Sequence, residues 1–546
     1  MTSPEKIDIG SLAGAALVYK DVASLDVVQE QIRILHLEPG LGSAPISCTI
    51  HRISLTSDPL PRYEALSYTW GDPKVTREII VNGYLINVTF NLYSALYRLR
   101  QPEDMRILWV DALCINQTDV DERGQQTVQE CILPQRATFI YGPVSIELSF
   151  MLQVFSALGR HMLADCCSTT GARTNPYLMP HLRKLGLAMR PIDELRSDRE
   201  GPDIPLWKAL SYTRSRFATD DRDRVFGVLG LVNSWMREPI VPNYRAMTEE
   251  IYTLATLDEV LATNSLSPLH FPLQKDAHPG VPSWVIDWTA GSNVSLRLNV
   301  YQWTQDHYLQ FRVSHKQPAR IEVRDNNRVL EVKGRRRDVY CEWFKMFELN
   351  RTPSRPYRTG EPYVDAFWKC LCWDFVLSVD GPAEKAHFRR SKGTTDSYEA
   401  FVAFAPVSNY SIFHPEGLSQ QDREAAVRFD PRFDIDQSAG MTEHTSETFI
   451  TEQLIGGITL NTAMFMTESG YLGLGPAETQ VGDEVWCLFG SYMPFVLRSM
   501  EKTREVVTGE GEKPLHLVLG ICYVHGAMDG EVADDENLPI ETVYLA

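Results

Sequence analysis

The residues best placed for chemistry are polar side chains that follow predicted strands. Asp111 directly follows the apolar run Ile107–Val110, and Asn116 comes soon after it. Upstream, a β-rich run ends in Trp70-Gly71-Asp72. Residues at the carboxyl ends of strands are placed to line a cleft in an α/β sheet, and the indole of Trp70 can stack on a ligand ring there. The same residues can also serve the fold alone, with Trp70 in the core and the two aspartates capping backbone N–H groups.

Other chemistries have less support from the sequence. Cys370-x-Cys372 has no second ligand pair, and His161 followed by two cysteines lacks the spacing of a structural zinc site. The acidic residues at 119–122 can bind Mg²⁺, but the helix dipole already explains acids in the first turn of a helix. The sequence has neither a Gly-x-x-x-x-Gly-Lys-Ser/Thr loop nor a Gly-x-Ser-x-Gly elbow. We therefore expect no metal and assign no certain cofactor.

A sheet with flanking helices is expected to position the polar residues. Apolar residues after Asn91 recur with a helical period, and the continuous apolar run 107–110 is typical of a strand buried on both faces. Residues 119–131 have helical composition, and residues 137–141 resume strand character. This alternation predicts a parallel sheet flanked by helices, with any site at the carboxyl ends of its strands.

Short β segments precede this alternation. Residues 31–57 contain two apolar runs separated by Pro39-Gly40, which predicts two strands and a turn. A further β-rich run covers 63–70, and residues 79–88 form a predicted hairpin around Asn82-Gly83.

The rest of the chain changes character twice. Helical patterns over 145–165, 206–217, 222–231 and 249–262 predict an α-rich middle region. Residues 296–332 alternate like strands, and the charged, Pro-containing stretch 350–445 is expected to hold insertions or loops. From residue 463 to the end, short β runs broken by glycine turns predict a small antiparallel sheet or barrel.

Composition excludes several classes of protein. The 53 Lys+Arg residues against 71 Asp+Glu give a net charge of −18, which disfavours general binding to nucleic acid or anionic membranes. The basic cluster Lys333–Arg337 is interpreted as a solvated strand end. No apolar run reaches the roughly 20 residues of a spanning helix, and the ten scattered cysteines are typical of reduced thiols. We expect a soluble, cytoplasmic protein without a membrane span.

Several segments together resemble the heterokaryon incompatibility (HET) domain of filamentous fungi. The three that carry the resemblance within the domain are Tyr63–Pro73, Leu108–Gln117 with its continuation to Gln126, and Thr127–Glu130. The resemblance continues beyond the domain in Asp220–Gly227, Pro282–Trp288, Gly470–Pro476 and Tyr523–Glu531. It implies a role in fungal self/non-self recognition and programmed cell death, with protein partners or self-association.

One departure from the family pattern concerns the junction of Gln126 and Thr127. In the family, further helix, a strand and several tens of residues stand between the segments that meet here, including a Trp of the third motif. The sequence therefore predicts an internal deletion, with one fused helix near 119–132 and a sheet short by a strand.

A more distant resemblance, of HET domains to TIR domains, implies an enzymatic alternative. It makes Glu130 the candidate catalytic carboxylate and NAD the substrate of a glycohydrolase. Nicotinamide leaves as a neutral group, so a carboxylate that stabilises the oxocarbenium ion is sufficient and no general acid is required. The candidate cleft then consists of Trp70, Gly71, Asp72, Asp111 and Asn116. Two other interpretations stay open: a catalytically silent interaction module, and the non-functional product of a mis-spliced or decaying gene.

The expected architecture has five segments. A TIR-like α/β domain with a parallel sheet is followed by an α-rich region and a C-terminal antiparallel β module. The segments are a β-rich lead-in (1–57), a shortened HET domain (58–165), a helical region (166–290), a mixed, partly irregular region (291–455) and the β module (456–546).

Overall fold

The computed structural model describes the chain in stretches that form two compact units. The described residues are 4–22, 25, 31–54, 62–119, 136–162, 189, 195–196, 204–214, 218, 220–232, 234–235, 238–270, 278, 280–289, 310–315, 317–343, 356–378, 387–391, 420, 424, 458–459, 462–500, 505–508 and 511–546. The first unit comprises residues 1–137, 226–231 and 240–247, and the second comprises the remainder. The five-segment division stays a prediction.

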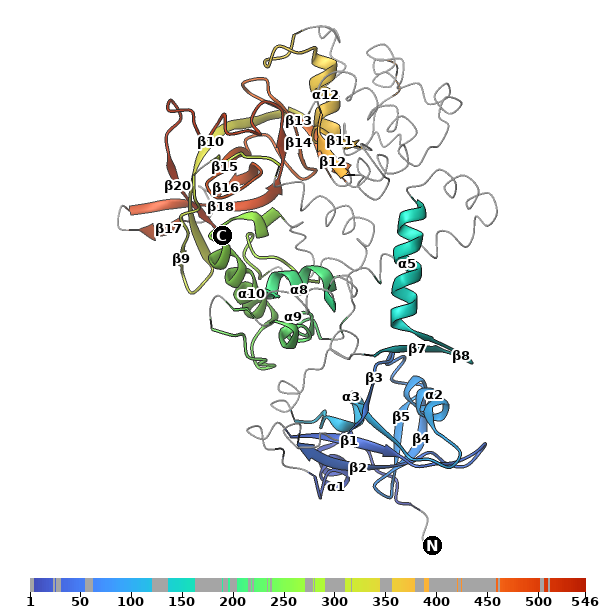
Figure 1. Ribbon diagram of the computed structural model, residues 1–546. Helices are drawn as coiled ribbons and strands as arrows, with labels where there is room; N and C mark the ends of the chain where they lie inside the picture. The colour runs from blue at the N-terminus through green and yellow to red at the C-terminus, as the bar shows by residue number, and fades with distance from the viewer. Residues whose placement is uncertain are drawn as a thin grey trace. The chain divides into compact units, whose positions relative to one another are not determined.

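One six-stranded sheet forms the first unit, in the order β3-β6-β1-β2-β4-β5. Figure 1 draws this sheet in blue. Its strands are β1 (Gln31–Leu37), β2 (Ser47–Ser54), β3 (Glu64–Leu66), β4 (Thr76–Val81), β5 (Tyr84–Thr89) and β6 (Arg106–Val110). The pairs β3·β6 and β2·β4 are parallel, whereas β1·β6, β1·β2 and β4·β5 are antiparallel. The sheet is therefore mixed.

The expectation of a parallel sheet was wrong for most of these pairs. Residues 38–46 between β1 and β2 are too few for the crossover that a parallel pair needs, so the two strands run antiparallel. Strands β4 and β5 join through Asn82 and Gly83, with φ of 50° and 83°, as a tight hairpin turn requires. The predicted hairpin around Asn82-Gly83 and the two predicted strands within 31–57 are confirmed. Strands β1 and β2 belong to the same sheet as the HET-like segments.

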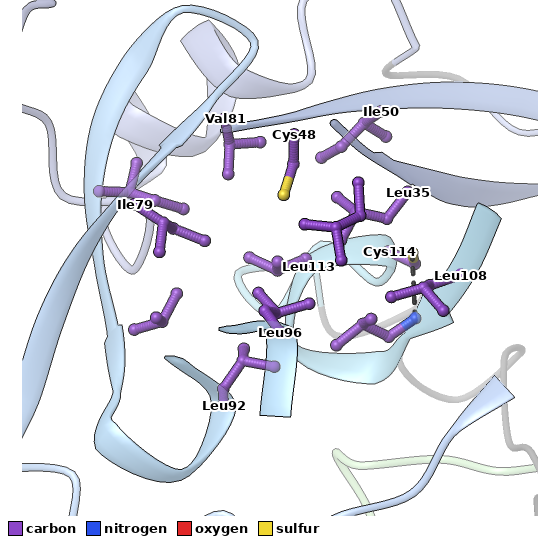
Figure 2. Packing of buried hydrophobic residues seen from close by; sticks show 14 of the residues in the cluster. Leu35, Cys48, Ile50, Ile79, Val81, Leu92, Leu96, Leu108, Leu113 and Cys114 are labelled. Atoms are coloured by element: carbon purple, nitrogen blue, oxygen red, sulfur yellow. Dashed lines mark hydrogen bonds between the residues drawn. The ribbon is translucent and has the colours of Figure 1, made fainter. Parts of the chain in front are cut away.

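Among the described residues, the helices α1 (Leu12–Val18), α2 (Phe90–Leu99) and α3 (Asp111–Cys114) accompany the sheet. Alternate residues of the strands meet apolar residues of the helices in one buried cluster (Figure 2). Leu35 and Leu108 come from paired strands, while Leu92 and Leu96 come from one face of α2. The predicted helix after residue 91 and the buried strand after it are confirmed, with the strand beginning at Arg106.

An exposed hairpin and a helix follow in the second unit. Strand β7 (Thr138–Tyr141) pairs antiparallel with β8 (Val144–Glu147), and α5 (Leu148–Met162) comes next. The strand expected at 137–141 thus exists, but it pairs with the antiparallel strand β8 and not with a strand of a parallel sheet. The connection between the two strands, residues 142–143, explains this because a two-residue turn brings the chain directly back beside β7. The fused helix predicted near 119–132 lies outside the described residues.

The described residues in the middle of the chain form several helices. They are α8 (Leu206–Thr213), α9 (Asp223–Phe226) and α10 (Thr248–Thr263), with 3₁₀ turns η1 (Leu229–Leu231) and η2 (Ser267–His270). The helix predicted over 249–262 is confirmed, and that over 206–217 ends earlier in the described part. The α-rich character of the whole region stays a prediction.

A ten-stranded sheet, part of which closes into a ring, forms the core of the C-terminal part of the second unit. Its strands are β9 (Glu322–Arg324), β10 (Val329–Trp343), β13 (Thr462–Thr467), β14 (Leu472–Pro476), β15 (Glu484–Leu488), β16 (Phe495–Ser499), β17 (Glu505–Thr508), β18 (Gly511–Ile521), β19 (Tyr523–Val524) and β20 (Glu541–Leu545). Strands β15, β16, β18 and β20 pair in turn, and β10 pairs with both β20 and β15. The ring closes at Gly334, where a Cβ would lie 2.6 Å from the carbonyl oxygen of Cys487. The predicted C-terminal β module is confirmed, with one parallel pair, β18·β20.

Strand β10 corrects the interpretation of the basic cluster. Lys333–Arg337 lies within this 15-residue strand and not at its end. A bulge between Arg336 and Asp338 interrupts its pairing with β15. Helix α12 (Tyr363–Leu371) and the antiparallel pair β11 (Phe375–Ser378) and β12 (His387–Arg390) also belong to this unit, and α12 packs against β14.

Two further findings concern the described part of the chain as a whole. None of its helices combines the length and the apolar character needed to cross a bilayer. Among its cysteines, Cys48, Cys114, Cys370, Cys372, Cys487 and Cys522 are buried free thiols.

Candidate functional site

The parallel pair of β3 and β6 brings the two HET-like motifs to one edge of the sheet. Leu66 pairs with Val110, so both strands end at the same level. The chain then continues to Trp70 after β3 and to Asp111 after β6. The indole Nε1 of Trp70 donates a hydrogen bond to Oδ2 of Asp111 at 2.9 Å. This bond links motifs that lie 41 residues apart in the sequence.

Asp111 occupies a partly buried position that disfavours its charge. Burial raises the pKa of its carboxyl group, while hydrogen bonds from Trp70 and from the backbone N–H of Ala112 lower it. The Ala112 bond is 2.6 Å long and reaches Oδ1, so each carboxylate oxygen accepts one donor. The Trp70 residue itself is 46% exposed. The pair therefore presents a half-buried carboxylate beside an accessible aromatic ring.

Gly71 and Asp72 shape the turn that carries Trp70. Gly71 has φ of +76°, and a Cβ there would lie 2.7 Å from Nδ2 of Asn91. That amide donates to the carbonyl of Thr69 at 2.8 Å. Asp72 accepts the backbone N–H of Lys74 at 2.9 Å through Oδ1. Both residues thus hold the turn, and Asp72 has the capping role considered above.

Asn116 also takes part in a turn. Its Oδ1 accepts from the backbone N–H and the hydroxyl group of Thr118, at 3.2 and 2.8 Å. The next residue, Gln117, donates through Nε2 to the backbone carbonyl of Asp111 at 3.0 Å. The segment after α3 is therefore fixed against the residue that carries the carboxylate.

Two buried residues that the sequence analysis did not identify, Arg33 and Tyr19, bind the C-terminal end of α3. Arg33 is 0% exposed and donates to the carbonyl of Cys114 at 3.2 Å and to that of Val22 at 2.8 Å. Its Cζ lies 4.7 Å from the centroid of the Tyr19 ring. The hydroxyl group of Tyr19 lies 3.0 Å from the carbonyl oxygen of Leu113. The carbonyls that end α3 are thus bound to a guanidinium and a phenol, which positions Asp111 at the other end.

A signal for Arg33 was present in the sequence. It shares the period-2 face of Leu35 and Leu37 in an otherwise apolar strand, and an ionised side chain on a core face needs buried partners.

Glu130, the catalytic candidate, lies outside the described residues, as does the whole stretch 120–135. The structure thus brings together Trp70 and Asp111 and places Gly71, Asp72 and Asn116 in the turns beside them. Within the described ranges, no three His, Cys, Asp or Glu side chains gather as metal ligands would.

Comparisons with known proteins agree with this arrangement. The sequence model described as heterokaryon incompatibility protein (HET) matches residues 63–139, which include both members of the Trp70–Asp111 pair. The one described as Het-6 beta-barrel domain matches residues 376–545. A Neurospora crassa protein, heterokaryon incompatibility protein 6, OR allele, is 41% identical over 681 aligned positions, which cover 96% of this chain and 97% of that protein. No solved structure matches the chain.

Proposed function

The chain belongs to the family of heterokaryon incompatibility protein 6, and on that premise we propose that it acts in self/non-self recognition between fungal cells. Its HET domain is the effector or signalling module, and its output is programmed cell death in the cytoplasm of fused cells. The observation that carries this proposal is the extent of the relationship, because 41% identity runs through 96% of the chain and so includes the HET part and the barrel part together.

Expression in a fungal host tests this function. Neurospora crassa strains that carry the coding sequence are fused with strains of both incompatibility types, and the viability of the fused cells is counted. Death in one pairing and survival in the other are expected. Equal survival in both pairings, with the protein present at normal levels, refutes the proposal.

The Trp70–Asp111 pair is the expected working surface of the effector. Trp70→Phe keeps an aromatic ring but removes the indole N–H that Asp111 accepts. A matched control is Tyr97→Phe, since Tyr97 is 48% exposed and comes from the same unit. Loss of cell death in the Trp70 variant alone supports the assignment, whereas equal activity of both variants contradicts it.

A second candidate function is cleavage of NAD by a TIR-like HET domain, with Glu130 as the carboxylate. What favours it is the accessible indole beside a half-buried carboxylate at the carboxyl ends of β3 and β6, where open α/β sheets bind ligands. Purified protein is incubated with NAD, and nicotinamide release is followed for wild type, Glu130→Gln and the nearby Gln129→Ala control. Release that persists in Glu130→Gln removes Glu130 from the mechanism, and no release at any concentration removes the enzymatic function.

We also propose that a coding block is missing between Gln126 and Thr127. The alignment with the Neurospora protein spans 681 positions, more than the 546 residues of this chain, so the relative has segments without a counterpart here. Sequencing of transcripts across this junction tests the proposal. An uninterrupted transcript that matches genomic DNA, with no open reading frame between the two codons, excludes an annotation error and leaves a natural deletion.

Self-association is the proposed form of the interaction function. Every residue of β7 and β8 is exposed, and the large apolar ones are 37–89% exposed. In the described part of the chain, this two-stranded sheet has no further strand, so its edges offer unpaired backbone groups that a second copy can match. Sedimentation of wild type and Ile140→Lys tests this, and a wild type that stays monomeric at all concentrations refutes it.

A further inference from the structure

Three consecutive arginines on β10, Arg335, Arg336 and Arg337, differ in their interaction partners. Arg335 donates to a backbone carbonyl at 2.7 Å, and Arg336 pairs with Glu484 at 2.6 Å. Arg337 instead lies over the ring of Tyr471, with its Cζ 4.3 Å from the ring centroid. Its Nε is buried and has no hydrogen-bond acceptor among the described residues. A buried Nε cannot be reached by a ligand, so the terminal nitrogens Nη1 and Nη2 are the donors of Arg337 that can meet a ligand oxygen.

A second guanidinium reaches the same ring from another segment. The Cζ of Arg358, which precedes α12, lies 4.4 Å from the Tyr471 centroid. Arg358 donates one hydrogen bond, through Nη1, to the backbone carbonyl of Ser469. That acceptor is neutral, so the bond leaves the charge of Arg358 without compensation. Within the described residues, neither arginine forms an ion pair.

The nearby carboxylates are engaged elsewhere. Asp338 accepts two backbone N–H groups, at 3.0 and 3.3 Å. The pKa of Asp535 is lowered first by hydrogen bonds from Asn537, and the charge of Arg337 is a lesser cause. Two positive charges therefore converge on one aromatic ring in a chain whose net charge is −18.

The third nearby carboxylate, Glu361, is neutralised by its own partners. It accepts from Nε2 of His525 at 2.5 Å, from the hydroxyl group of Thr359 at 2.6 Å, and from the ammonium group of Lys369. Burial opposes its ionisation, but these three hydrogen bonds prevail and lower the pKa of Glu361 to about 2. This network also fixes the segment that presents Arg358.

The fold holds Tyr471 in place. Its backbone N–H donates to the hydroxyl group of Thr467 at 3.0 Å, in the turn between β13 and β14. Gly526 has φ of +89°, and a Cβ there would lie 3.5 Å from the Tyr471 ring and 3.0 Å from Thr359. Three segments, one on β10, one before α12 and one after β13, thus meet at the ring of Tyr471.

We propose that Arg337, Arg358 and the hydroxyl group of Tyr471 form a receptor for the phosphate group of a small phosphorylated metabolite. A phosphate monoester carries up to two negative charges and three terminal oxygens, enough for two guanidinium forks and one hydroxyl group. A carboxylate, with two oxygens, satisfies one fork only. Long polyanions such as nucleic acid are disfavoured because the acidic chain repels them.

Calorimetric titration of the full-length protein tests the receptor. The probes are inorganic phosphate, glycerol 3-phosphate and AMP, at ionic strength matched with chloride. The variants are Arg358→Gln, Tyr471→Phe and Arg337→Lys. The matched control is Arg328→Gln, because Arg328 is likewise exposed and donates to a backbone carbonyl, that of Gly280 at 3.3 Å.

Wild type is expected to bind the three probes with similar affinity, since only the phosphate is recognised. Loss of one charge-assisted contact should weaken binding about tenfold or more in Arg358→Gln, and the Arg328→Gln control should bind like wild type. The proposal fails if wild type binds no phosphate, if Arg358→Gln binds as tightly as wild type, or if the control is weakened equally. It also fails if AMP binds far more tightly than glycerol 3-phosphate. Because Arg358 is exposed, its variant is expected to fold, and none of these readouts depends on cell death or NAD cleavage.

Discussion

Replacing Arg33 by methionine tests whether a buried charge holds the candidate site in place. The variant keeps a long side chain but loses the hydrogen bonds to the carbonyls of Val22 and Cys114, at 2.8 and 3.2 Å. Hydrogen bonds from charged groups contribute about 1.5–3 kcal/mol each, and methionine recovers roughly 1–2 kcal/mol through apolar burial. We therefore expect the first unit to lose about 3 kcal/mol of stability.

Hydrogen exchange read by mass spectrometry measures this loss in the full-length chain. Two compact units need not unfold together, so a local readout is preferable to a single melting temperature. Amides of β1, β6 and α3 should exchange about a hundredfold faster in the variant, which corresponds to about 3 kcal/mol. The second unit should be unchanged.

Arg52 provides the matched control for this experiment. It stands directly opposite Arg33 in the pairing of β1 with β2, but it is exposed. Arg52→Met should change stability by less than about 0.5 kcal/mol. The reasoning is refuted if both variants change stability by the same amount. It is also refuted if Arg33→Met is as stable as wild type, because apolar packing would then replace the charge without loss of stability.

Three further predictions follow from single residues. Leu96→Ala opens a cavity in the core of the first unit and should destabilise it by about 2–5 kcal/mol, whereas Tyr97→Ala on the exposed side of α2 should change urea denaturation little. Gly71→Ala forces a side chain into a left-handed conformation against Asn91, which should reduce stability by about 1–3 kcal/mol; a normal urea midpoint would contradict this. The folded-state pKa of Glu361, about 2, lies below the usual 4.5, so its contribution to stability is present above pH 4.5 and is lost as pH falls toward 2. The thermal midpoint of Glu361→Gln should therefore fall less than that of wild type between pH 5 and 3, and parallel curves would disprove the assignment.

Local patterns predicted the elements better than their partners. The Asn82-Gly83 hairpin, the helix with Leu92 and Leu96, and the strand that stops at Val110 follow from turn chemistry and periodicity. Which strands pair depends on contacts distant in sequence, such as Leu35 with Leu108. Periodicity does not encode such pairings, so the mixed order of the sheet and the β7·β8 hairpin were not foreseen.

The candidate site shows the same division between local and long-range information. Asp111 and Trp70 were identified because each follows a β run, yet their hydrogen bond depends on the parallel register of β3 with β6. Arg33 was missed because its partners are backbone carbonyls, which leave no mark in a sequence. The phosphate receptor was missed for a related reason, since Arg337, Arg358 and Tyr471 come from three segments that only the folded barrel region brings together.

The proposed deletion is expected to affect the Trp70–Asp111 pair and the proposed NAD-cleaving site at Glu130 to different extents. Strands β3 and β6, Trp70 and Asp111 all precede the Gln126–Thr127 junction, and the described residues of the buried cluster that supports them extend no further than Ile115. The Trp70–Asp111 pair is thus expected to survive the deletion, whereas the surroundings of Glu130 change with it. Restoring the block should therefore alter NAD cleavage, if there is any, but leave hydrogen exchange around Asp111 nearly unchanged. Equal sensitivity of both readouts would mean that the missing block supports the sheet itself.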